Sequence, residues 1–127
     1  RKDFAPAANN LAWILLQSRG DIDRALALAH RAKRFNPDDP SICDTLGWAY
    51  VHKKAYYSAI AEFREALDKL PENPTVHYHL ATAQIKLGNR QKALKSLNTA
   101  ITSKLPFPER QRALELKQQI SEQHVAR

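Results

Sequence analysis

The sequence predicts an all-α protein: a right-handed solenoid of three helix-turn-helix units, closed by a C-terminal capping helix. Three observations support this fold class: a 34-residue internal period, apolar residues at helical spacing, and helix-start residues at matching points of the units. A single helix pair cannot bury its apolar face, so the pairs are expected to stack. The residues that recur at intervals of 34 are Ala25, Ala59 and Ala93; Ala32, Ala66 and Ala100; Leu26, Ile60 and Leu94; Pro37 and Pro71; and Pro40 and Pro74.

The period divides the chain into units that each begin with a recognisable helix start. Asp39-Pro40 and Asn73-Pro74 place a side-chain acceptor at the N-cap and proline at the first helical position. A stripe of apolar residues after Pro108 predicts the capping helix. The expected bounds, within a single domain spanning 1–127, are about 5–39, 40–73 and 74–107 for the units and about 108–122 for the capping helix.

The turns inside the units differ. Gly20-Asp21 and Gly88-Asn89 each offer a glycine that can turn left-handed and a cap for the next helix, whereas Lys54-Ala55 offers neither. We therefore expect the turn of unit two to be the least tightly specified. The small residues Ala12, Gly47 and Ala81 follow a spacing of 35 and then 34, so unit one has one extra residue, expected near Arg19-Gly20. Their small size should let helices approach closely.

Composition is that of a globular chain. Of 127 residues, 43% are hydrophobic and 26% charged, with no apolar run near the roughly 20 residues needed to cross a bilayer. We expect no membrane insertion by this segment. The lack of methionine and the start at Arg1 favour a piece of a longer polypeptide, and the single cysteine, Cys43, fits a small core residue. The net charge of +7 is spread along the chain, which favours a solvated surface.

No pattern indicates catalysis, a cofactor or a metal. His77 and His79 lie two residues apart, so on a helix they point in different directions and suit structural roles. His52 has no carboxylate or cysteine nearby in sequence, and three glycines cannot build a phosphate-binding loop. Acidic residues of the second helix in unit two are expected to pair within that helix, with Arg64 and Lys69; these are Glu62, Glu65 and Asp68. We therefore expect a protein that is not an enzyme.

The pattern of unit two resembles the tetratricopeptide repeat family: Leu46, Gly47, Tyr50, Ala59, Phe63, Ala66 and Pro71 meet the family's sequence of large and small residues. Units one and three depart from it, with Ala29 in the place of Phe63 and Gln84 in the place of Tyr50. The resemblance covers about residues 5–105. It implies a scaffold for protein-protein interaction that binds a peptide or protein in a concave groove.

A second resemblance concerns the sequence segments around Trp13, around Trp48 and at Leu105–Arg110. They are similar to C-terminal repeat arrays of bacterial envelope proteins, including those of exopolysaccharide systems (PEP-CTERM type). This resemblance implies a periplasmic or envelope-associated location.

In the family, the first helix of each unit lines the groove. The resemblance therefore implies ligand contacts by nine residues: Asn9, Trp13 and Gln17; Asp44, Trp48 and His52; and Tyr78, Thr82 and Lys86. The two tryptophans hold the same position, where they either offer apolar surface to a ligand or pack into the seam between helices. A carboxylate clamp is disfavoured, because Asn10 matches its asparagine but Pro6, Thr75 and His79 stand at its basic positions.

Two other functions remain open at this stage. The net charge could serve binding of an acidic polymer, polysaccharide or nucleic acid, although we expect no nucleic-acid partner from such scattered charge. The segment could also be a spacer or self-association module in a bacterial secretion or envelope assembly.

Overall fold

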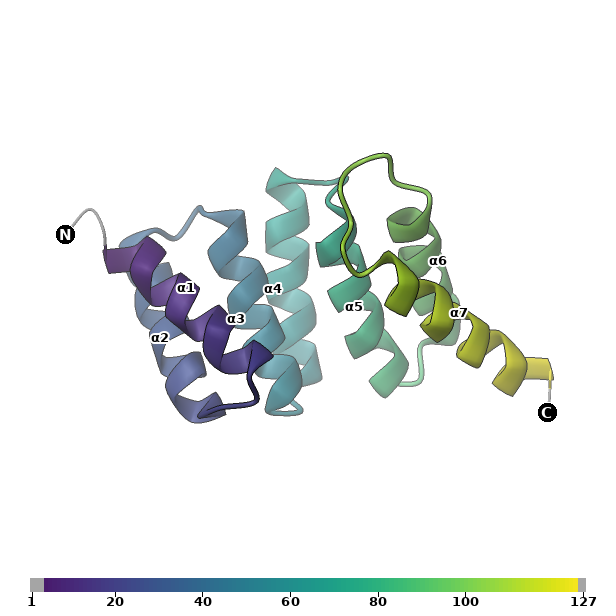
Figure 1. Ribbon diagram of the computed structural model, residues 1–127, viewed down its shortest axis with the longest axis horizontal. Coiled ribbons are helices and arrows are strands. Elements are labelled where there is room, and N and C mark those ends of the chain that lie inside the picture. The colour runs from purple at the N-terminus through teal and green to yellow at the C-terminus, as the bar shows by residue number, and fades with distance from the viewer. Residues whose placement is uncertain (1–3, 126–127) are drawn as a thin grey trace.

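The computed structural model of the protein describes residues 4–125, and this part of the chain contains seven α-helices and no strand. The helices follow one another in pairs, in chain order, along an elongated molecule (Figure 1). They are α1 (Phe4–Gln17), α2 (Ile22–Phe35), α3 (Pro40–His52), α4 (Tyr56–Lys69), α5 (Pro74–Lys86), α6 (Arg90–Ile101) and α7 (Arg110–Val125).

Consecutive helices form three pairs, α1 with α2, α3 with α4, and α5 with α6, and each pair packs on the next. Helix α7 packs against α6 and covers the last pair through Ala113 and Ile120, which are buried together with Phe107. The expected all-α array of three units and a capping helix is confirmed. None of the helices between residues 4 and 125 is long and apolar enough to cross a membrane.

Both predicted proline starts are present. The Asp39 carboxylate accepts a hydrogen bond from the backbone N–H of Ser41 (2.8 Å), and the Asn73 side chain accepts one from Val76 (3.2 Å). These bonds satisfy amide groups that have no partner within the helix. Helices α3 and α5 therefore begin at the two prolines.

The turn within unit one differs from expectation. Gly20 does not adopt the left-handed conformation; Arg19 does, with φ of 55°. The backbone N–H of Gly20 instead donates to the carbonyl oxygen of Leu15 (2.8 Å). Asp21 is then the additional residue, and its extended backbone lets its side chain accept from the N–H of Arg24 (3.0 Å). The longer turn thus supplies a dedicated N-cap.

Units two and three lack that additional residue, and the predicted cap at Asn89 is wrong. The backbone N–H of Asn89 donates across the turn to the carbonyl oxygen of Gln84, and that of Ala55 donates to the carbonyl oxygen of Tyr50. Both residues have ψ of 69°, whereas the capping residue Asp21 has ψ of 98°. A residue that closes the preceding helix in this way does not direct its side chain at the next one, and neither makes a side-chain cap. The unfavourable residue in the turn of unit two is therefore Lys54, one residue before Ala55. Lys54 adopts a left-handed conformation with φ of 63°, whereas the equivalent residue of unit three is a glycine, Gly88, with φ of 81°.

The small residues of the first helices are buried where the sequence predicted close approach. At Gly47, an added Cβ would lie 2.4 Å from Cε1 of Phe63, a ring with no exposed surface. Unit one combines Ala12 with the smaller Ala29 in one core cluster, and unit three combines Ala81 with Leu97 in another. In unit two, the missing side chain at Gly47 thus makes room for the ring of Phe63.

Candidate functional site

The inner helices α1, α3 and α5 contact one another in sequence, α1 with α3 and α3 with α5. Between them lies an open pocket of about 240 Å³. Three residues predicted to bind a ligand line it, and four polar residues complete it. The lining residues are Asn9, Asn10, Trp13, Ser41, Asp44, Thr45 and Thr75.

His79 organises the wall of this pocket. It is 2% exposed and its Nδ1 donates to Oδ1 of Asp44 at 2.8 Å. Trp48 stacks on the imidazole ring with 4.1 Å between centroids, and Trp13 approaches it from α1 at 5.9 Å. Three successive units therefore meet at one histidine, in the structural role that the sequence predicted for it. His77 lies apart, with Nε2 2.8 Å from the carbonyl oxygen of Pro71.

The two tryptophans have different surroundings although they hold equivalent positions. Both are partly exposed. Trp48 packs against the core cluster between units one and two and against the one between units two and three, whereas Trp13 packs against none of the clusters found in residues 4–125. Trp48 thus joins the seam between units, whereas Trp13 lines the pocket.

The remaining predicted residues spread along the inner helices, and several are held by the protein itself. Asn9 is 9% exposed and its Nδ2 donates to Oγ of Ser41 (3.2 Å). His52 contacts the carbonyl oxygen of Trp48 through Nδ1 (2.9 Å), and the Thr82 hydroxyl donates to that of His79 (2.6 Å).

The far end of the groove contains Tyr78, which packs edge-on to Phe107 and whose pKa is raised by burial. Gln17 and Lys86 are exposed at the C-terminal ends of their helices.

The clamp positions carry no fixed positive charge in space either. Pro6 is exposed, and His79 is bound to Asp44. The hydroxyl of Thr75 donates to the carboxylate of Glu109 at 3.0 Å, which brings a negative charge to the rim of the pocket. An acidic ligand would meet like charge here.

Sequence reasoning missed Ser41 and Thr45 as pocket residues. Their spacing carried the signal, because Ser41, Thr45 and Trp48 follow one another at intervals of four and three on α3 and so share a face. Both hydroxyls are partly used internally: Thr45 donates to the carbonyl oxygen of Ser41.

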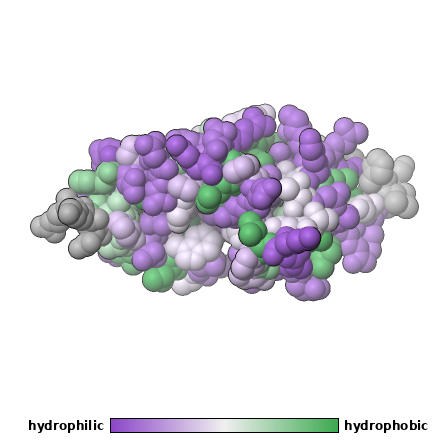
Figure 2. All heavy atoms as spheres, turned by 90° about the horizontal axis from the view of Figure 1, so that it is seen from above, coloured by the Kyte–Doolittle hydropathy of each residue, from purple (hydrophilic) through white to green (hydrophobic). Residues whose placement is uncertain are grey.

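The surplus positive charge lies mainly away from the groove. Helix α1 has no charged side chain, and apart from histidines α3 contributes only the charge of Asp44 and α5 only that of Lys86. The outer helices α2 and α6 hold four and three basic residues. The face seen from above is mostly hydrophilic, with hydrophobic residues in small separate patches (Figure 2).

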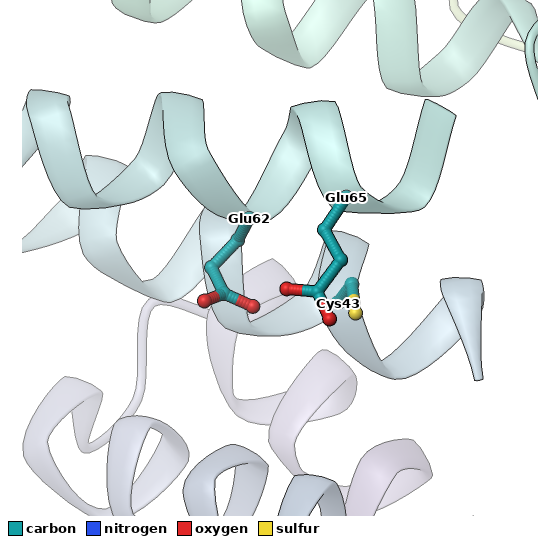
Figure 3. Close-up of side chains that lie close together, drawn as sticks. All are labelled: Cys43, Glu62 and Glu65. Carbon is teal, nitrogen blue, oxygen red and sulfur yellow. The ribbon is translucent and has the colours of Figure 1, made fainter. Parts of the chain in front are cut away.

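A second group of side chains joins units one and two. One ligand atom each from Cys43, Glu62 and Glu65 lie within 4.8 Å of one another (Figure 3), a spacing that could suit a metal. The ammonium group of Lys33, from α2, instead binds both carboxylates, at 2.7 and 2.8 Å. The expected pairing of Glu62 and Glu65 within α4 is therefore wrong, because they pair across units.

The electrostatics of this group fit an ion pair better than a metal site. Burial lowers the pKa of Lys33, but its bonds to Glu62 and Glu65 outweigh burial, so the net pKa is raised and the group stays charged. Burial raises the pKa of the Cys43 thiol to about 11, so at neutral pH this thiol is a neutral group beside the ion pair. Cys43 is 2% exposed, as expected of a core residue.

Comparison with known proteins decides the family. The sequence model described as tetratricopeptide repeat matches residues 50–120, more than half of the chain. The chain belongs to the tetratricopeptide repeat family. The TPR repeat-containing protein PA4667 of Pseudomonas aeruginosa is 32% identical over 71 residues, which are 56% of this chain but only 12% of that relative.

Solved tetratricopeptide repeat structures have the same fold. The first TPR of Spaghetti (RPAP3), bound to the HSP90 peptide SRMEEVD, superposes with a TM-score of 0.84 at 16% identity, covering 100% of this chain and 97% of the other. PcrH, in complex with the chaperone binding region of PopD, superposes with a TM-score of 0.82 at 16% identity, covering 98% and 96%.

Proposed function

We propose that this chain is a protein-interaction module that binds a peptide segment of a partner along the groove of α1, α3 and α5. The observation that carries the proposal is Trp13, a partly exposed indole that lines the pocket without joining a core cluster. Large aromatic side chains in such a position supply much of the affinity of protein interfaces. Relatives of the same fold that hold a peptide or a protein segment support this reading.

Gln17, Trp48, His52, Tyr78, Thr82 and Lys86 would extend the contact along the groove. The alternative of an acidic polymer receives less support, because the basic residues gather on outer helices. Self-association also stays open, and light scattering over a range of concentrations would reveal it. Action in a bacterial envelope or exopolysaccharide assembly remains a prediction from the sequence.

The test is a random-peptide display library selected on the wild-type chain, with the selected peptides then titrated against Trp13→Ala. We expect at least about tenfold weaker binding, the loss typical of an interface anchor. Tyr57→Ala is the matched control, because Tyr57 lies on outer helix α4 and is 77% exposed. Circular dichroism shows whether each variant keeps its helicity. Selected peptides that bind Trp13→Ala as tightly as the wild type would refute the groove as the binding site.

A further inference from the structure

One acceptor in the pocket between α1, α3 and α5 has no partner. Oδ1 of Asn9 is buried and accepts no hydrogen bond in the described part of the chain, while Nδ2 of the same amide donates to Ser41. A buried carbonyl oxygen without a donor is unfavourable, so such an atom beside a pocket marks a place for a donor from a ligand.

The charge of the pocket points in the same direction. Asp44 is its only charged lining residue, and His79 uses Oδ1 of that carboxylate, which leaves Oδ2 for another donor. Glu109 adds a second carboxylate at the rim through Thr75. Apart from histidines, the one basic side chain of the inner helices is Lys86, which lies at the C-terminal end of α5 and does not line the pocket. The pocket is thus acidic within a chain of net charge +7.

The third feature is the aromatic wall. Trp13 lines the same pocket as Asn9 and Asp44. Indole rings attract cations, and arginine in particular combines stacking on an aromatic ring with several N–H donors in a fixed plane. A guanidinium stacked on the Trp13 ring would bring its N–H donors to the side of the pocket lined by the Asp44 carboxylate and the Asn9 amide.

We propose that this pocket receives a basic side chain of the partner, with arginine preferred to lysine. The proposal rests on the proposed function, because it names the residue type that a groove-bound peptide would insert. It assigns the opposite charge preference to that of a carboxylate clamp. It also gives Asn9, which the protein otherwise buries with half of its amide unpaired, a role in recognition.

The test uses N-acetyl-arginine amide as the probe, titrated into labelled protein and followed by NMR at the Trp13 indole N–H and the Asn9 side-chain amide. We expect both signals to move and to saturate. The N-acetyl amide of citrulline, which has nearly the same shape without the charge, should bind at least about tenfold more weakly. The N-acetyl amide of glutamate should leave the signals in place.

Asp44→Asn should weaken binding of the arginine probe about tenfold while its amide oxygen still accepts from His79. Asp68→Asn on outer helix α4 makes the same change in net charge and should have no effect. Asn9→Asp adds a negative charge beside the unpaired position and should strengthen binding. Equal binding of the glutamate probe, or unchanged affinity in Asp44→Asn, overturns the proposal.

Failure of this proposal can be told apart from failure of the proposed function. Selected peptides that depend on Trp13 but tolerate loss of every basic residue would leave the groove in place and overturn the basic-residue pocket. Binding of the arginine probe here, together with selected peptides whose affinity does not depend on Trp13, would have the opposite meaning. It would leave the basic-residue pocket in place and overturn the groove as the binding site of those peptides.

Discussion

Replacement of Gly47 by alanine tests how closely the two helices of unit two pack against each other. Gly47 lies within α3, and a Cβ there would stand 2.4 Å from Cε1 and 2.7 Å from Cδ1 of Phe63, where an ordinary contact begins at 3.4 Å. The ring is fully buried and cannot move into solvent. Overpacking of this kind costs about 1–3 kcal/mol. The helix preference of alanine over glycine returns about 0.5–1 kcal/mol. We expect a net loss of about 0.5–2 kcal/mol in the free energy of unfolding.

A second substitution, Phe63→Leu, tests whether the ring of Phe63 is the cause of this loss. Unit three already combines Ala81 with Leu97 in its core. In a Phe63→Leu background, Gly47→Ala should therefore be neutral or stabilising by about 0.5–1 kcal/mol, although Phe63→Leu alone is destabilising. The two substitutions would then show a favourable coupling of about 1–3 kcal/mol, measured from urea unfolding of all four proteins by circular dichroism. An equal effect of Gly47→Ala in both backgrounds would refute the role of the ring.

Lys54→Gly should raise the free energy of unfolding by about 1 kcal/mol, because Lys54 holds φ of 63°, a conformation that costs residues other than glycine about that much. Ala55→Asn should change it by less than about 0.5 kcal/mol, since Asn89 makes no cap in the same geometry. Lys33→Met should lower it by about 1–2 kcal/mol, because Glu62 loses its cation at a mostly buried position. Stability should also fall as the pH rises above about 9.0, because the raised pKa of Cys43 lets the folded chain keep a proton that the unfolded chain releases. Cys43→Ala should flatten this dependence.

The free energy of unfolding of each variant is measured by urea titration. For Cys43→Ala and the wild type, titrations at neutral and at alkaline pH are compared. The raised pKa of Lys33 acts in the same direction at higher pH, so Cys43→Ala should reduce the alkaline loss without abolishing it. A cap gain in Ala55→Asn would show that the turn geometry does not prevent capping. An alkaline slope that is identical in Cys43→Ala and the wild type would exclude the thiol as its source.

Much of the fold could be predicted because it is encoded locally. The proline starts at Pro40 and Pro74 need only the residue before each of them, and the 34-residue period needs only the spacing of alanines. The turns were predicted less well. Asn89 has the composition of a cap, but its backbone already closes the preceding helix, and that competition is visible only once both helices are in place.

The candidate site could be placed on α1, α3 and α5 from the sequence, but the roles of its residues could not. Trp13 and Trp48 hold equivalent positions in the repeat, yet Trp48 packs against the clusters of two units and Trp13 does not. His79 was expected to be structural, but its bond to Asp44 joins residues 35 apart, in different units. Periodicity states which positions are equivalent and cannot state which neighbours each copy meets.

By itself, the sequence determined the fold class of the protein and the number of its units, because helical spacing, small residues and proline starts act over a few residues or one repeat. Only the tertiary structure decided that the additional residue of unit one is the cap Asp21, that Lys33 links units through Glu62 and Glu65, and that Asn9 is left with an unpaired oxygen. These features depend on which atoms meet across stacked helices. That is set by packing of the whole array, and no local pattern contains it.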